Sequence, residues 1–138
     1  MLKSFAAAAL MAGLTLSACA TVPPVAAPAA AGTPVSLNQP VYVGDVVVTP
    51  LAVKEDSRCP ANVQCVWAGR VVVTTQIDGP DDAWRDTRDL ELEKSQAPSG
   101  MTVRLAEVSP AKTAGAEIAP ADYRFRFDAE RTWYTRPE

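Results

Sequence analysis

The stretch Tyr123-Arg124-Phe125-Arg126-Phe127 contains the clearest two-residue period in the chain, with aromatic residues at every second position and arginines between them. Successive side chains of a β-strand point to opposite faces of a sheet, so this alternation predicts a strand with one apolar face and one wet face. Because aromatic side chains bury the largest areas, we expect these three to lie at the centre of a hydrophobic core.

Short segments rich in β-branched or alternating apolar residues recur upstream, separated by turn sequences. Gly44 and Asp45 interrupt the first of them and Pro50 precedes another, so we expect a bend or a bulge near each point. Residues 70–77 are apolar at many positions on both faces, which predicts a central strand. The expected strands cover residues 41–48, 51–53, 70–77, 84–94, 101–105 and 123–127.

Short strands at close intervals, without a convincing helical period, predict an all-β domain. We expect a single immunoglobulin-like antiparallel sandwich, and a small β-barrel fits the same pattern. An α+β fold is a further alternative, because residues 111–121 contain enough alanine for a helical turn or two. The same segment is equally compatible with a long connection between strands.

Residues 1–18 have the three-part layout of an export signal. Lys3 precedes an apolar segment, residues 5–16, and small residues follow it before Cys19. A membrane-spanning helix needs roughly 20 apolar residues, and this segment is shorter. We therefore expect a cleaved signal and not a spanning helix.

The sequence Leu16-Ser17-Ala18-Cys19 resembles the lipobox of bacterial lipoproteins, which reads Leu, two small residues and Cys. The resemblance implies that Cys19 carries a diacylglycerol on its sulfur and becomes the acylated first residue of the mature protein. Ala20 and Thr21 follow, whereas an aspartate would favour inner-membrane retention, so the resemblance implies the periplasmic face of the outer membrane. The alternative is an ordinary secretory signal cut near Ala18 or Ala20, which would leave a free thiol.

Residues 19–34 form an Ala/Pro-rich segment that contains no charged residue. This composition cannot bury a core, and its prolines favour an extended geometry of about 3.1 Å per residue. We expect a semi-rigid tether that holds one domain, residues 35–138, away from the membrane. A chain of that length is typical of a single domain.

The composition argues against several classes of function. The net charge is −3 and the basic residues are scattered, whereas nucleic-acid binding needs a clustered cationic surface. The chain has no histidine, the usual general base near neutral pH and the usual zinc ligand. Asp78, Asp81 and Asp82 crowd one turn, but arginines follow among further carboxylates, which favours a solvated turn over a calcium site. We expect no enzymatic activity, no metal and no cofactor.

A second informative segment is Asp56-Ser57-Arg58-Cys59-Pro60 followed, after four residues, by Cys65-Val66-Trp67-Ala68-Gly69. It resembles a signature of small bacterial envelope proteins, and this resemblance implies an exported β-rich domain with a disulfide loop and no assigned reaction. With Cys19 committed to lipid, Cys59 and Cys65 are left to pair with each other in an oxidising compartment.

Two interpretations of this loop differ in the role of Trp67. In the structural interpretation, which we take as the default, Trp67 packs over the disulfide. Arg58 then pairs with Asp56 or Glu55. In the functional interpretation, Arg58, Trp67 and Arg70 form a rigid recognition edge for an envelope protein or a glycan. Trp and Arg are enriched in binding hot spots, and a cross-linked loop loses little entropy on binding.

The sequence therefore predicts a cell-envelope protein that is attached to the membrane through lipid on Cys19. Its domain is expected to be a non-catalytic binding or structural module, with no role in nucleic-acid binding. The alternative is an envelope protease inhibitor that presents the loop between Cys59 and Cys65 to its target.

Overall fold

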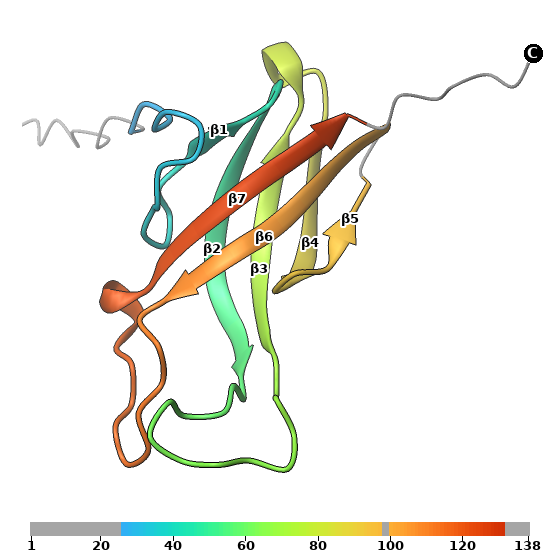
Figure 1. Ribbon diagram of the computed structural model, residues 1–138. Helices are drawn as coiled ribbons and strands as arrows, with labels where there is room; N and C mark the ends of the chain where they lie inside the picture. Colours follow the sequence, from blue (N-terminus) through green and yellow to red (C-terminus); the bar gives the residue numbers. More distant parts are fainter. Residues whose placement is uncertain (1–25, 98–99, 132–138) are drawn as a thin grey trace, which may run out of the picture.

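The computed structural model describes residues 26–97 and 100–131, so the predicted signal and Cys19 lie outside the described residues. The described chain forms two antiparallel sheets, and β6 and β7 run obliquely across the face of the four-stranded sheet (Figure 1). The first sheet contains β1 (Val41–Val43), β2 (Val46–Asp56), β3 (Val71–Asp78) and β4 (Arg85–Glu91), and the second contains β5 (Ser95–Gln96), β6 (Met101–Ser109) and β7 (Arg124–Arg131).

The predicted all-β sandwich is confirmed. Within each sheet the strands follow one another in sequence order, so each strand pairs with a neighbour along the chain. Immunoglobulin domains have Greek-key connections, whereas the strands of this domain follow sequence order within each sheet. The likeness to immunoglobulin domains therefore lies in the two-sheet architecture. The alanine-rich segment 111–121 is a connection between β6 and β7, and its one helical element is a short 3-10 turn, Pro120–Asp122.

The interruptions predicted near Gly44 and Pro50 have different structural forms. Gly44 and Asp45 form the two-residue turn between β1 and β2, and Gly44 has the positive φ of 61° that favours glycine in such turns. At Pro50 the chain does not start a new strand, because β2 continues through it with a shift in register before Ala52. A proline has no N–H to donate to the neighbouring strand, which suits a bulge.

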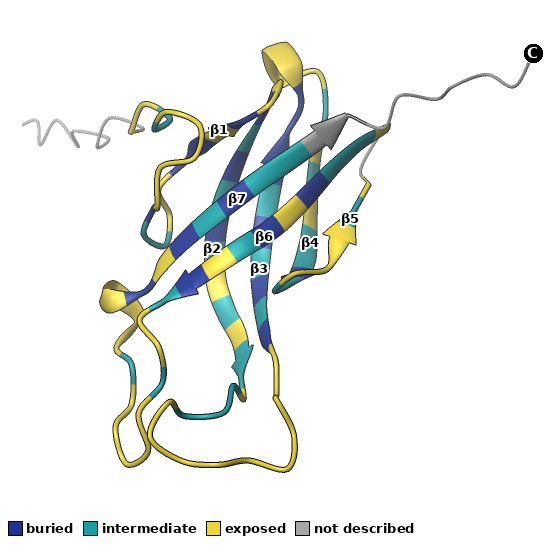
Figure 2. Ribbon diagram, in the orientation of Figure 1, coloured by how far each residue is buried: buried dark blue, intermediate teal, exposed yellow. Residues whose placement is uncertain are grey.

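The core lies between the two sheets and is built mainly from alternate residues of β1, β2, β3, β6 and β7, with Leu90 from β4 (Figure 2). In β3, which is the predicted central strand, every second residue from Val71 to Ile77 is fully buried. Phe125 is the largest fully buried side chain, and its ring stacks on that of Tyr123 with centroids 5.7 Å apart. The three aromatic residues of the segment 123–127 are all buried, as their spacing predicts.

The segment before β1 lies along one side of the sandwich and contacts both sheets. Ala29 forms a bridge to Val41 of the first sheet. Val35, which is fully buried, exchanges two backbone hydrogen bonds of 2.9 Å with Phe125 of the second sheet. Part of the region predicted as a tether therefore packs against the domain, since an uncharged segment can pair at a sheet edge at little desolvation cost.

Candidate functional site

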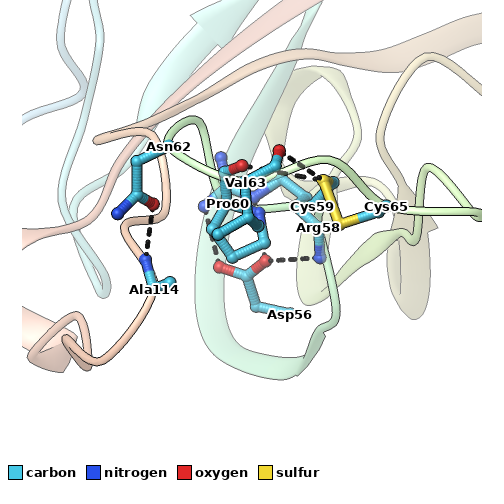
Figure 3. The surroundings of a disulfide bond; sticks show 8 residues. All are labelled: Asp56, Arg58, Cys59, Pro60, Asn62, Val63, Cys65 and Ala114. Carbon is cyan, nitrogen blue, oxygen red and sulfur yellow. Dashed lines mark hydrogen bonds and ion pairs between the residues drawn. A yellow bond between two sulfur atoms is a disulfide. The ribbon is translucent and has the colours of Figure 1, made fainter.

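The candidate site is the loop that connects β2 to β3, which contains both cysteines of the domain and which we call the cysteine loop (residues 57–69). At its base, the Ser57 N–H donates to the Arg70 carbonyl at 2.8 Å. One step further, the Cys59 N–H donates to the Ala68 carbonyl at 3.0 Å. A disulfide joins Cys59 to Cys65, with their Cα atoms 5.9 Å apart (Figure 3). The loop is thus a hairpin extension with a cross-linked end.

Gly69 lets the two sides of the cysteine loop approach each other. Its φ is +68°, a conformation that side-chain-bearing residues rarely adopt. A Cβ atom at this position would lie 1.8 Å from the backbone oxygen of Ser57. The hairpin closes in this form because residue 69 has no side chain.

Asp56, the last residue of β2, is the centre of a hydrogen-bonded cluster beneath the loop. Arg58 donates to both of its carboxylate oxygens, from Nε at 2.8 Å and from Nη2 at 2.7 Å (Figure 3). The Tyr123 hydroxyl donates to Oδ2 at 2.9 Å. The ion pair is largely buried, with side-chain exposures of 14% for Arg58 and 7% for Asp56.

Arg58 also ties the cysteine loop to the distant connection between β6 and β7. Its Nη1 donates to the Val108 carbonyl at 2.9 Å and its Nη2 to the Pro110 carbonyl at 3.2 Å. From the other side, Lys112 Nζ donates to the Asp56 carbonyl at 2.7 Å. Of the two predicted partners of Arg58, Asp56 is confirmed, whereas Glu55 pairs with Arg70. These contacts direct the Arg58 guanidinium into the protein instead of towards a partner.

The surroundings of this cluster shift two pKa values in opposite directions. Partial burial acts to raise the pKa of the Asp56 carboxyl, but hydrogen bonds from Arg58 and Tyr123 outweigh it, so this pKa lies below its usual value. Burial, together with the hydrogen bond to the Asp56 carboxylate, raises the pKa of the Tyr123 hydroxyl to about 12. The cluster therefore consists of a carboxylate, a guanidinium and a neutral phenol at neutral pH.

Two further hydrogen bonds hold the cysteine loop against the segment that follows β6. The Ala61 N–H donates to the Lys112 carbonyl at 2.8 Å, and the Ala114 N–H donates to Asn62 Oδ1 at 2.8 Å. Figure 1 shows these two connections side by side at one end of the sandwich, and Figure 3 shows the contact between Asn62 and Ala114. The first half of the loop is therefore braced from outside as well as by the disulfide.

The second half of the loop projects into solvent. The exposed fraction is 95% for Val66 and 82% for Trp67, and Val63 is 43% exposed. The expectation that Trp67 packs over the disulfide is therefore wrong: the bracing contacts fix the other side of the loop and leave the indole without a surface to cover. We call Val63, Val66 and Trp67 the apolar tip.

The three residues predicted as a recognition edge have different environments. Trp67 is exposed, whereas Arg58 faces inward. Arg70 lies at the base of the loop, is 55% exposed, and forms an ion pair with Glu55 over 2.8 Å. The sequence interpretation did not include Val66. The sequence feature that could have indicated its role is the ten-residue run 60–69, which contains no charged residue.

The acidic turn after β3 lies at the end of the sandwich away from the cysteine loop (Figure 1). Asp78 forms an ion pair with Arg85 and accepts a hydrogen bond from Gln76 Nε2 at 2.8 Å. These residues border an open hollow that also includes Asp82. In residues 26–97 and 100–131, no group of three or more acidic or cysteine side chains is arranged to hold a metal ion.

Helices long and apolar enough to cross a bilayer do not occur in the part of the chain that the structure describes. The chain matches no protein-family model, no curated protein and no solved structure.

Proposed function

We propose that this chain is a lipid-anchored cell-envelope protein whose domain is a non-catalytic binding module, with the apolar tip as its contact surface. The observation that carries this proposal is the exposure of Trp67, 82%, on a loop that is otherwise braced. A large aromatic side chain held in water by a rigid support is typical of a binding hot spot. Because the disulfide and the Asp56 cluster already order the loop, binding would cost little conformational entropy.

The charged groups around the loop support binding in preference to catalysis. Arg58 and Asp56 form a largely buried ion pair, and Arg70 pairs with Glu55. Groups engaged in this way hold the loop in shape. A catalytic role would instead require acid, base or nucleophile side chains that converge on a space for a substrate.

The direct test is photo-crosslinking in living cells from an unnatural amino acid at position 67. We expect crosslinked products that are absent when the same group replaces Tyr42, which is 48% exposed but belongs to β1. The variant Trp67→Ala should lose the partner and keep the stability of the wild type. Unfolding of Trp67→Ala, or the same products from position 42, would contradict the proposal.

The membrane anchor has a separate test, because it depends on Cys19 alone. In Cys19→Ala we expect no acylation and impaired removal of the signal. Metabolic labelling with a fatty-acid analogue, together with membrane fractionation, measures both effects. Normal processing of this variant to a soluble product would contradict lipid anchoring and favour an ordinary secretory signal.

Protease inhibition is the second candidate, and the braced, protruding loop is the observation that favours it. An inhibitor can present such a segment to an active site at little entropic cost. Titration against serine and cysteine proteases decides between the two: stoichiometric inhibition at micromolar concentration that Trp67→Ala abolishes would support it. No inhibition of any protease tested would remove this candidate.

A further inference from the structure

We infer that the apolar tip enters the headgroup region of the phospholipid bilayer that carries the protein. The inference rests on the proposed function, in which the tip is the contact surface and Cys19 is lipidated. It identifies the partner as a lipid surface and not as a pocket of another protein. Three features carry it: the charge distribution around the tip, the side chains of the tip, and the length of chain between Cys19 and the domain.

The first feature is a surface without charge that spans two connections. The run 60–69 of the cysteine loop contains no charged residue, and neither does the run 113–116 beside it. The hydrogen bond from the Ala114 N–H to Asn62 holds these runs together. At the ends of these runs, Arg70 pairs with Glu55, Lys112 donates to the Asp56 carbonyl, and Glu117 is exposed. A surface that enters a bilayer has to avoid the cost of desolvating charges.

The second feature is the chemistry of the exposed side chains. Trp67 has an apolar ring with one N–H donor, and such rings are enriched where a membrane meets water. Val66 adds an aliphatic side chain that is 95% exposed.

The backbone of the loop limits how deep the tip can go. The Cys59 N–H and the Val63 N–H have partners inside the loop, at 3.0 Å and 3.3 Å. An irregular loop nevertheless leaves other backbone groups to water, and such groups cannot enter the hydrocarbon core. We therefore place the tip among the headgroups, with Val66 and Trp67 as the deepest residues.

The third feature is reach. The described chain begins nearer the opposite end of the sandwich from the cysteine loop (Figure 1). The residues from Cys19 to Pro28 could span about 30 Å in extended proline-rich geometry. Strand β2, Val46–Asp56, has 11 residues, which corresponds to a length of about 36 Å. In this geometry, the segment from Cys19 to Pro28 would be somewhat shorter than β2 alone, so the domain would have to lie inclined along the surface for the tip to reach it.

The test uses the mature lipidated protein reconstituted in phosphatidylcholine vesicles, with bromine on the acyl chains near the headgroups. We expect bromine to quench a component of tryptophan fluorescence that is lost in Trp67→Phe. Val66→Asp should remove the same component, because a carboxylate at the tip opposes insertion. Thr33→Asp, which places the same charge on an exposed site away from the tip, should retain it.

Persistent accessibility of Trp67 to aqueous iodide, without quenching by brominated lipid, would overturn the bilayer inference. Crosslinking from position 66 in cells separates this outcome from failure of the proposed function. Lipid adducts support the inference. Adducts to a protein alone contradict the inference and leave the binding module standing. No adducts beyond those from position 42 contradict both.

Discussion

A single carboxylate, that of Asp56, determines how three separate parts of the chain meet. It binds Arg58 within the cysteine loop and Tyr123 at the entrance to β7. Its backbone carbonyl accepts Lys112 from the connection between β6 and β7. Because the ion pair is largely buried, removal of one partner would leave a buried charge without compensation.

Tyr123→Phe tests the phenolic part of this cluster. We expect a loss of about 1–3 kcal/mol in the free energy of unfolding at neutral pH, since the hydroxyl donates to a charged group. Urea denaturation measures it. Tyr42→Phe, on the exposed side chain of β1, is the control and should change stability little.

Comparison of the wild type with Tyr123→Phe also tests how stability changes at alkaline pH. The pKa of Tyr123 is about 12 in the folded protein, against about 10 for an unfolded tyrosine. As the pH rises past about 10, the unfolded chain releases its proton first, so this contribution to stability is present below that pH and disappears towards pH 12. The difference in stability between wild type and Tyr123→Phe should therefore shrink between about pH 10 and pH 12. A constant difference would contradict it.

Gly69 and Gly115 form a matched pair for the closure of the loop, because both have positive φ, +68° and +81°. A Cβ atom at Gly115 would meet nothing within 4 Å, whereas at Gly69 it would collide with the Ser57 carbonyl. We expect Gly115→Ala to cost about 1–2 kcal/mol and Gly69→Ala to cost several kcal/mol. Thermal unfolding of both variants measures the difference, and equal costs would show that the loop relaxes around the clash.

The sequence limits the ionic partner of Arg58 to Asp56 or Glu55, because both carboxylates lie within three residues of it. It could not identify the Val108 and Pro110 carbonyls, since backbone acceptors have no signature in a sequence and these lie far along the chain. The default interpretation, in which Trp67 covers the disulfide, is wrong for a related reason. A tryptophan next to a disulfide is usually expected to cover it, and only the arrangement of two distant connections shows which side of the loop is free.

At the scale of elements, the two-residue period was the reliable signal. Strands with one buried face, such as β3 and β7, could be located from alternation, because burial itself imposes the period. Their ends could not, since pairing extends β6 to Ser109 beyond its clearly alternating residues. The pairing of Ala29 with Val41 could not be foreseen either, because an Ala/Pro-rich composition resembles a linker whether or not it packs.

Val35→Asp tests whether this preceding segment is part of the folded unit. Val35 is fully buried and paired with Phe125, so an aspartate there would bury an unpaired charge. We expect a loss of more than about 3 kcal/mol, or failure to fold. Thr33→Asp, two residues earlier and exposed, should be tolerated. Similar stability of the two variants, measured by denaturant unfolding, would show that the segment is dispensable.

At the scale of the whole molecule, the acidic turn after β3 and the apolar tip lie at opposite ends of the sandwich (Figure 1). The double variant Cys59→Ser and Cys65→Ser tests how far the cysteine loop depends on its cross-link. Chain entropy for so short a ring predicts a loss of about 2.4 kcal/mol. The domain should nevertheless fold, because Arg58 and Asn62 hold the loop independently of the disulfide. Comparison of urea midpoints for the oxidised wild type and the variant measures this, and loss of folding would show that the cross-link is essential.

The sequential strand order also has a consequence for how quickly this domain folds. Among the described strands β1–β7, each ladder joins neighbours in sequence. Most pairings therefore need only modest loop closure, which favours fast folding for an all-β protein. The exchange between Val35 and Phe125 is different, because it brings the two extremes of the domain together. We expect this contact to be absent from the folding transition state, so that conservative changes at Val35 accelerate unfolding and leave the folding rate almost unchanged.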